Sequence, residues 1–184
     1  MAMTPSNMLA LGTKAPDFNL LNTVDDTLIN LENAKGLNGT VIMFICNHCP
    51  FVKHVNETLS ELAKQYISKG INCIAISSND ADKYPSDSPE NMKQNAIDND
   101  FIFPYLYDET QAVAKAYDAA CTPDFYVFDK NLTLVYRGQL DDSRPGNGIP
   151  VSGKDLKNAL DNILENQPVS EVQKPSIGCN IKWK

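Results

Sequence analysis

Residues 41–69 read VIMFICNHCPFVKHVNETLSELAKQYISK. Every position from 41 to 45 is apolar, which is typical of a strand covered on both faces. The apolar run stops at Cys46 and Cys49. Beyond them, apolar residues recur at spacings of three and four, which predicts an amphipathic helix. A strand that leads into a helix through Cys-x-x-Cys indicates a thiol redox site.

The neighbouring patterns extend this unit into an α/β chain. Residues 71–78 predict a second buried strand, so 41–78 form a strand–helix–strand unit whose two strands are parallel. Residues 15–20 and 28–31 predict a short N-terminal hairpin. The remaining patterns predict helices at 89–98, 109–119 and 154–165, a short strand within 101–107, and an antiparallel hairpin of strands 125–128 and 132–136.

Composition excludes several classes of partner. The chain has 184 residues, a net charge of −7 and a pI near 4.7, which argue against nucleic acid and against an anionic membrane surface as partners. The N-terminal sequence lacks a basic start followed by a long apolar run, so we expect no signal peptide. No apolar run approaches the length of a membrane span. With five cysteines, an odd number, and no export signal, we expect reduced thiols and a cytoplasmic location.

Four motifs resemble landmarks of the redoxin branch of the thioredoxin-like superfamily, which includes the peroxiredoxins of the alkyl hydroperoxide reductase type. They are APDF at 15–18, CNHC at 46–49, FPYLYD at 103–108 and TPDFYVFD at 122–129. The likeness extends over about residues 11–164. It implies a thioredoxin-like fold with a central mixed β-sheet flanked by helices, comprising a domain at 1–166 with an N-terminal hairpin and a C-terminal tail at 167–184.

The cysteine pair carries the predicted chemistry. A helix N-terminus lowers the pKa of a nearby thiol, and residues i and i+3 of a first helical turn are close enough to form a disulfide. By resemblance, Cys46 is the exposed attacking thiol and Cys49 resolves the mixed disulfide. An imidazolium at His48 would stabilise the Cys46 thiolate and make the disulfide more oxidising. We therefore predict thiol–disulfide exchange at these three residues, with no cofactor. The partners would be a protein or small-molecule disulfide and a thiol reductant system.

Other residues are assigned by the same resemblance. Thr122-Pro123 is placed as a cis-proline site facing the cysteine pair, with Thr122 as a substrate contact. Cys121 and Cys179 are candidate resolving thiols, although Cys121 also fits a small buried residue and Cys179 an idle thiol in the tail. Cys73 lies among Ile and Ala in a strand and is expected to be in the core.

An antioxidant peroxidase is the first alternative. Pro50 suits the first position of a helix, which makes Cys49 its N-cap. This arrangement resembles the peroxidatic cysteine of peroxiredoxins, which a hydroperoxide oxidises to sulfenic acid. Two departures count against it: Cys46 stands where that site has a threonine, and Arg137 comes one strand later than the expected arginine.

The second alternative is a redox-inactive or metal-carrying binding module. Cys46, His48, Cys49 and His54 are close in sequence and are metal-ligating residue types. A structural zinc site requires four well-spaced ligands, and the chain has no second cysteine pair of that kind. We therefore predict no metal site.

Overall fold

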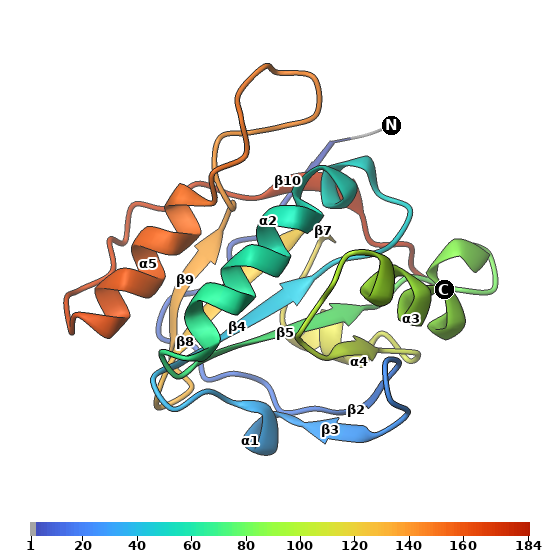
Figure 1. The fold of residues 1–184 in the computed structure, drawn as a ribbon, viewed down its shortest axis with the longest axis horizontal. Coiled ribbons are helices and arrows are strands. Elements are labelled where there is room, and N and C mark those ends of the chain that lie inside the picture. Colours follow the sequence, from blue (N-terminus) through green and yellow to red (C-terminus); the bar gives the residue numbers. More distant parts are fainter. Residues whose placement is uncertain (1–2) are drawn as a thin grey trace.

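The computed structural model describes residues 3–184, which form an α/β fold around a mixed β-sheet (Figure 1). Its strands are β2 (Asn19–Asn22), β3 (Leu28–Asn30), β4 (Gly39–Phe44), β5 (Ile71–Ser77), β6 (Tyr105–Tyr107), β8 (Asp124–Asp129) and β9 (Leu134–Gly138). Within residues 3–184 they are ordered β3-β2-β6-β5-β4-β8-β9. The predicted mixed sheet is thereby confirmed.

Strand β4 lies inside the sheet and sets the register around the cysteine pair. Val41 pairs with Cys73 of the parallel strand β5 on one side and with Val127 of the antiparallel strand β8 on the other. The predicted strand–helix–strand unit is confirmed, and so are the two hairpins, β2–β3 and β8–β9.

Helices cover both faces of the sheet, which explains why β4 is apolar at successive positions. Met43 packs in a core with α2 (Pro50–Ile67), α3 (Pro89–Asp98) and α5 (Lys154–Leu164), whereas Phe44 packs on the opposite face with α1 (Leu31–Ala34) and α4 (Ala112–Ala116). Helix α4 is shorter than the predicted helix at 109–119. Gln111 and Asp118 have positive φ angles of 63° and 51°, and this backbone cannot continue a right-handed helix on either side.

A second, three-stranded sheet joins the two ends of the described chain. It consists of β1 (Thr4–Pro5), β10 (Ile177–Asn180) and β7 (Cys121–Thr122), in that order. Strand β10 belongs to the segment assigned to the C-terminal tail, whose sequence predicts no structural role. Figure 1 shows β10 crossing near the amino-terminal end of α2, where the cysteine pair lies. The tail therefore contributes directly to the surroundings of the predicted site.

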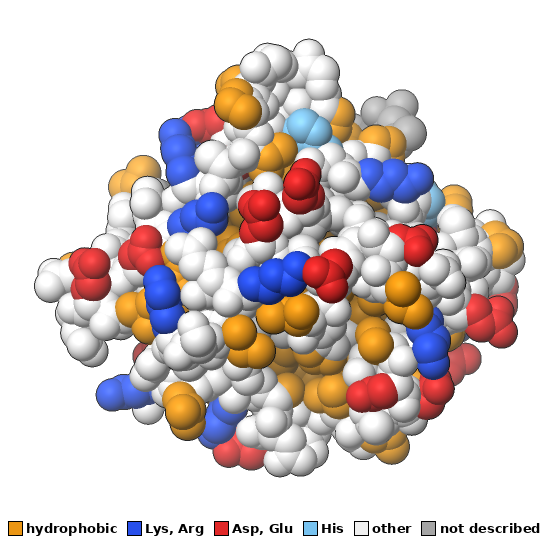
Figure 2. Space-filling view, in the orientation of Figure 1, with side chains coloured by type: hydrophobic (Ala, Val, Ile, Leu, Met, Phe, Trp, Pro, Cys, Tyr) orange, Lys and Arg blue, Asp and Glu red, His pale blue; other side chains and the backbone are white. Residues whose placement is uncertain are grey.

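Two structural features bear on membranes and polyanions as partners. Among residues 3–184, no helix has both the length and the apolar character needed to cross a membrane. Figure 2 shows acidic and basic side chains interspersed over the face that carries α2, rather than a continuous basic tract on that face. Such a face offers no extended attraction for a polyanion.

Candidate active site

The helix start places Cys49 as predicted. Cys49 is the N-cap of α2 and Pro50 occupies the first helical turn, while the Cys49 carbonyl accepts hydrogen bonds from the N–H groups of Val52 and Lys53. The positive end of a helix dipole therefore lies next to the Cys49 side chain. This geometry favours a negative charge on its sulfur.

Both cysteines of the pair are buried, with 1% of Cys46 and none of Cys49 exposed. The expectation of an exposed Cys46 is wrong. Cys46 follows β4 closely, and its sulfur lies 3.3 Å from the Thr122 hydroxyl oxygen, so the segment around Thr122 covers it. Neither sulfur can meet a partner molecule without local movement of the chain.

Three groups of hydrogen-bond donors surround the Cys49 sulfur. A hydrogen bond from the Cys46 thiol lowers the pKa of Cys49 to about 5, and burial, which acts in the opposite direction, is outweighed. The Cys179 thiol and the backbone N–H groups of Val52 and Cys179 lower it further. The Cys49 and Cys179 sulfurs are 2.8 Å apart, and the Thr122 carbonyl oxygen lies 3.3 Å from Cys49 and accepts from its thiol form. At neutral pH, Cys49 is the thiolate of this cluster.

The pKa of Cys46 is shifted in the opposite direction. Its thiol donates to Cys49, and this raises the pKa of Cys46 well above its ordinary value. Burial raises it further, as does the negative charge of Asp87, because each disfavours a second anion in the cluster. This order of pKa values differs from the roles implied by the resemblance, in which Cys46 is the attacking thiol: Cys49 is the more acidic thiol of the pair and Cys46 the less acidic.

His48 is held by a buried carboxylate. Its Nδ1 lies 2.6 Å from Oδ2 of Asp87, and its ring stacks on Tyr84 with centroids 5.5 Å apart. Asp87 also accepts from the Asn47 N–H at 2.8 Å and from the Asn79 side chain at 2.8 Å. Burial acts to raise the pKa of Asp87, but the hydrogen bonds from His48 and Asn79 outweigh it and hold the pKa below its ordinary value. The loop at 79–88 thus orients the segment between the two cysteines.

The Thr122-Pro123 peptide bond is cis, as predicted. The backbone of Thr122, predicted to contact substrate, pairs with Cys179 of β10 in an antiparallel register. The position expected for a partner's extended chain is therefore occupied by the protein's own C-terminal strand.

The other two cysteines are buried. The Cys121 thiol lies 3.7 Å from the Pro123 carbonyl oxygen, and burial raises the pKa of Cys121 far above its ordinary value. Burial alone raises the pKa of Cys73 to about 12, and Cys73 packs in the core as predicted. Neither thiol ionises near neutral pH, so neither matches the reactivity of Cys49.

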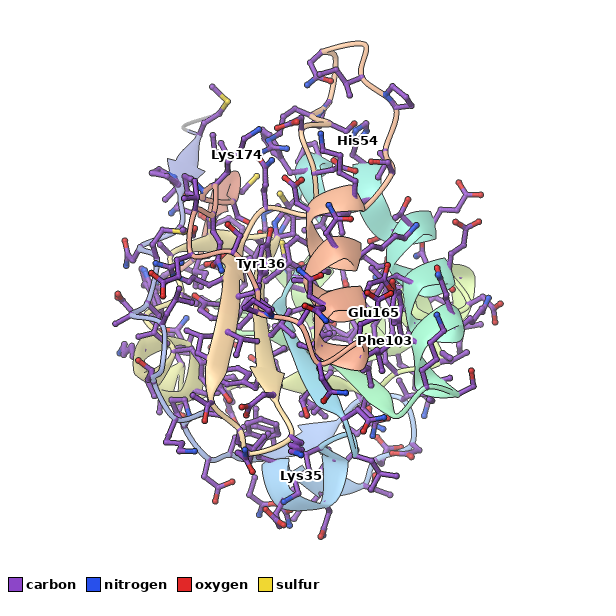
Figure 3. All side chains as sticks on the ribbon, turned by 90° about the vertical axis from the view of Figure 1, so that its left-hand side faces the viewer. Lys35, His54, Phe103, Tyr136, Glu165 and Lys174 are labelled. Carbon is purple, nitrogen blue, oxygen red and sulfur yellow. The ribbon has the colours of Figure 1, made fainter. Side chains whose placement is uncertain are left out.

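Three side chains could hold a metal ion by distance alone. Ligand atoms of Cys46, His48 and Asp87 all lie within 4.8 Å of one another. A hydrogen bond joins His48 to Asp87, and the Cys46 sulfur lies 3.3 Å from the Thr122 hydroxyl oxygen. His54, the other predicted candidate, lies elsewhere: its Nε2 is 2.7 Å from the Ser143 hydroxyl, beneath the loop at 141–153 (Figure 3).

Comparisons with known proteins agree with this fold. The AhpC/TSA family matches residues 11–137, which include the cysteine pair, the buried carboxylate and the cis proline. The chain belongs to the AhpC/TSA family. It is thus a thioredoxin-like protein of the redoxin branch, and membership of this AhpC/TSA family supports a general role in thiol redox chemistry.

Three solved structures similar to this AhpC/TSA-family chain differ widely in sequence identity. An uncharacterized conserved protein from Geobacillus kaustophilus is 62% identical with a TM-score of 0.98, covering 100% of this chain and 97% of its own. A hypothetical protein from Sinorhizobium meliloti 1021 is 45% identical with a TM-score of 0.96, covering 98% of each chain. A thiol:disulfide interchange protein of the thioredoxin family from Chlorobium tepidum TLS shares the fold at 17% identity and a TM-score of 0.64, covering 84% of this chain and 98% of its own. Comparison with curated proteins gave no match.

Proposed function

We propose that this protein is a thiol–disulfide oxidoreductase in which Cys49 is the attacking thiolate. The observation that carries the proposal is the set of donors directed at the Cys49 sulfur, which hold its pKa at about 5. Thiolates, rather than thiols, attack disulfides, so a residue ionised at neutral pH is the natural nucleophile of this cluster. The cytoplasmic location remains a prediction from cysteine usage.

Cys46 acts through Cys49 in this proposal. Its thiol donates the hydrogen bond that contributes most to the low pKa of Cys49. His48 and Asp87 support the same arrangement, because their contact fixes the segment that links the two cysteines. The charge of Asp87 also keeps Cys46 protonated, and therefore able to donate. We assign Cys46, His48 and Asp87 as positioning residues for the Cys49 thiolate.

A thiol peroxidase is the second candidate function. It is favoured by Cys49 at the N-cap with Pro50 directly after it, because a low-pKa thiolate at a helix start also reacts with hydroperoxides. The two functions share their nucleophile and differ in the oxidant. An assay that offers the reduced protein a small disulfide and a hydroperoxide in parallel distinguishes the two functions.

Single cysteine variants test the proposed function. Reduction of a model disulfide, with an external dithiol as the final reductant, should be abolished by Cys49→Ser and retained at reduced rate by Cys46→Ser. Cys73→Ser is the matched control, because Cys73 is a buried core cysteine outside the cluster, and it should react as wild type. Disulfide reduction that survives Cys49→Ser would contradict the proposal. Rapid consumption of hydroperoxide without disulfide reduction would favour the peroxidase.

A further inference from the structure

The C-terminal strand holds a third thiol against the reactive sulfur, and it is fixed along its length. Within β10, Cys179 pairs with Thr122 of β7. Beyond the strand, the backbone N–H of Lys182 donates to the Asn79 side chain at 2.8 Å, and its carbonyl accepts from the Gln111 side chain at 2.9 Å. These contacts, at Cys179 and after it, hold the strand where the Cys179 sulfur lies 2.8 Å from that of Cys49.

A glycine beside Cys179 makes this approach sterically feasible. A Cβ atom on Gly178 would lie 1.9 Å from the Thr122 carbonyl oxygen, far inside contact distance. Any other residue at 178 would push β10 away from β7, and with it the Cys179 sulfur. Gly178 therefore lets the backbone of β10 lie close to that of β7, and this places the adjacent Cys179 thiol against the Cys49 sulfur.

Two thiols could release a substrate from Cys49, and their surroundings differ. Once Cys49 is in a mixed disulfide it carries no charge, which removes one obstacle to ionising either neighbour. Cys46 then still faces the anionic Asp87, which raises its pKa. Burial raises the pKa of Cys179 to about 12, as do the hydrogen bond with Cys49 and the charge of Cys49, and the positive charge of Lys182 acts in the opposite direction. Loss of the Cys49 charge in the mixed disulfide removes one cause of the raised Cys179 pKa, and the 2.8 Å separation of the Cys49 and Cys179 sulfurs places the Cys179 thiol for attack.

We propose that Cys179 is the resolving cysteine for a mixed disulfide on Cys49, an inference that rests on the proposed function above. The Cys49 thiolate attacks a disulfide R–S–S–R′ and forms Cys49–S–S–R, while R′–S⁻ leaves with the electron pair and takes a proton from solvent. Cys179 then gives its proton to solvent, and its thiolate attacks the Cys49 sulfur. R–S⁻ leaves and is protonated. The substrate has been reduced to two thiols, the protein holds a Cys49–Cys179 disulfide, and an external dithiol restores the reduced form.

This mechanism requires β10 to separate from β7 and return. Cys49 has no exposed surface, and the cleft beside Pro123 and Ile177 has a volume of about 20 Å³, room for roughly one water molecule. A substrate therefore reaches Cys49 when the short β7–β10 ladder opens, a local opening of the kind that short peripheral strands undergo. When the strand returns, Cys179 again lies against the Cys49 sulfur and can attack the mixed disulfide.

Ellman's reagent, an aromatic disulfide with a coloured leaving group, distinguishes the steps in the full-length reduced protein. We expect the wild type to release both halves of the reagent, and peptide mapping to find the Cys49–Cys179 disulfide. Cys179→Ser should release one half and retain the other on Cys49. Cys46→Ser should still release both halves, but at a reduced rate, and the matched control Cys73→Ser should react as the wild type does. Because Cys179→Ser could unfold, circular dichroism checks its fold, and mapping of the wild-type disulfide gives the same answer without any variant.

Each other outcome overturns the inference in an identifiable way. If Cys46→Ser retains one half and Cys179→Ser releases both, with a Cys46–Cys49 disulfide in the wild type, resolution belongs to Cys46 and the proposed function stands. If Cys179→Ser and Cys46→Ser both release both halves, Cys179 is not required and the proposed function stands. If Cys49→Ser reacts as the wild type does, or the wild type does not react, the proposed function fails together with the inference.

Discussion

The sulfur atoms of Cys49 and Cys179 lie 2.8 Å apart, although 130 positions separate them in the sequence. This contact joins the start of α2 to the C-terminal strand β10, and it has two physical consequences. Cys179 adds hydrogen-bond donors to the thiolate, and β10 hides that thiolate from solvent. Reactivity and access at Cys49 are therefore both tied to β10.

Removing the Cys46 thiol should raise the pKa of Cys49. In Cys46→Ala the strongest donor to the Cys49 sulfur is lost while the helix start is unchanged, so the ionisation midpoint should move from about 5 toward the ordinary cysteine value. The ultraviolet absorbance of the thiolate, followed during a pH titration, measures this midpoint without any reagent having to enter. Cys73→Ala is the control and should leave it in place. An unchanged midpoint in Cys46→Ala would show that this hydrogen bond does not set the pKa.

Adding a methyl group at Gly178 should expose Cys49. The new Cβ in Gly178→Ala would collide with the Thr122 carbonyl and displace β10, at a cost of about 1–3 kcal/mol. Alkylation of Cys49 by a small reagent should accelerate roughly tenfold or more, since the open form becomes more populated. Gly146→Ala is the control: its φ of 81° also strains an alanine, but the strain falls in the loop at 141–153, where a Cβ meets nothing within 4 Å. Equal alkylation rates in both variants would mean that β10 does not govern access.

A buried carboxylate on β8 should make the fold less stable as the pH rises. Burial raises the pKa of Asp124 to about 8, against about 3.9 in an unfolded chain, so the folded protein binds more protons between these values. Its contribution to stability is complete below pH ~3.9 and is lost as pH rises through about 8, by up to about 1.4 kcal/mol per unit. Asp124→Asn, which mimics the protonated acid, should flatten this slope in urea unfolding series. A slope that persists in the variant would assign it to other groups.

Asp87 should show the opposite pH dependence. Its folded pKa is held below the unfolded value, so its contribution is present above pH ~3.9 and is lost as pH falls through the folded pKa. Asp87→Asn should remove this acid-side loss and destabilise the fold at neutral pH by about 1–3 kcal/mol, because its buried donors lose a charged acceptor. Asp82→Asn, at an exposed position of the same loop, is the control. Equal stability of the two variants at neutral pH would contradict this role.

The strand, the helix and the cis proline could be predicted from the sequence, because each is marked by a local pattern or motif. Apolar residues at successive positions identified β4, the spacing of apolar residues identified α2, and Thr122-Pro123 was recognised within its motif. These features depend on residues close together in the chain. The same local signals located Cys46 and Cys49 at the junction.

The remaining parts of the site depend on contacts between distant segments. β10 is a four-residue strand whose position is set by pairing with Thr122, and nothing periodic in its sequence indicates that pairing. Asp87 lies in a polar loop, and no sequence pattern indicates that its side chain is buried against His48. The one indication in the sequence is that this loop follows a buried strand of the central unit. The roles of Cys46 and Cys49 depend on which thiol donates to which, and that is decided by Asp87 and Cys179 in three dimensions.

The most direct test of the central claim, that Cys49 is the thiolate, is the difference in thiolate absorbance between the reduced wild type and Cys49→Ser across a pH titration. The account predicts a single thiolate that is absent from the variant and appears in the wild type with a midpoint near 5. A difference that appears only near the ordinary cysteine pKa of about 8.5, or a low-pH thiolate that persists in Cys49→Ser, would contradict it.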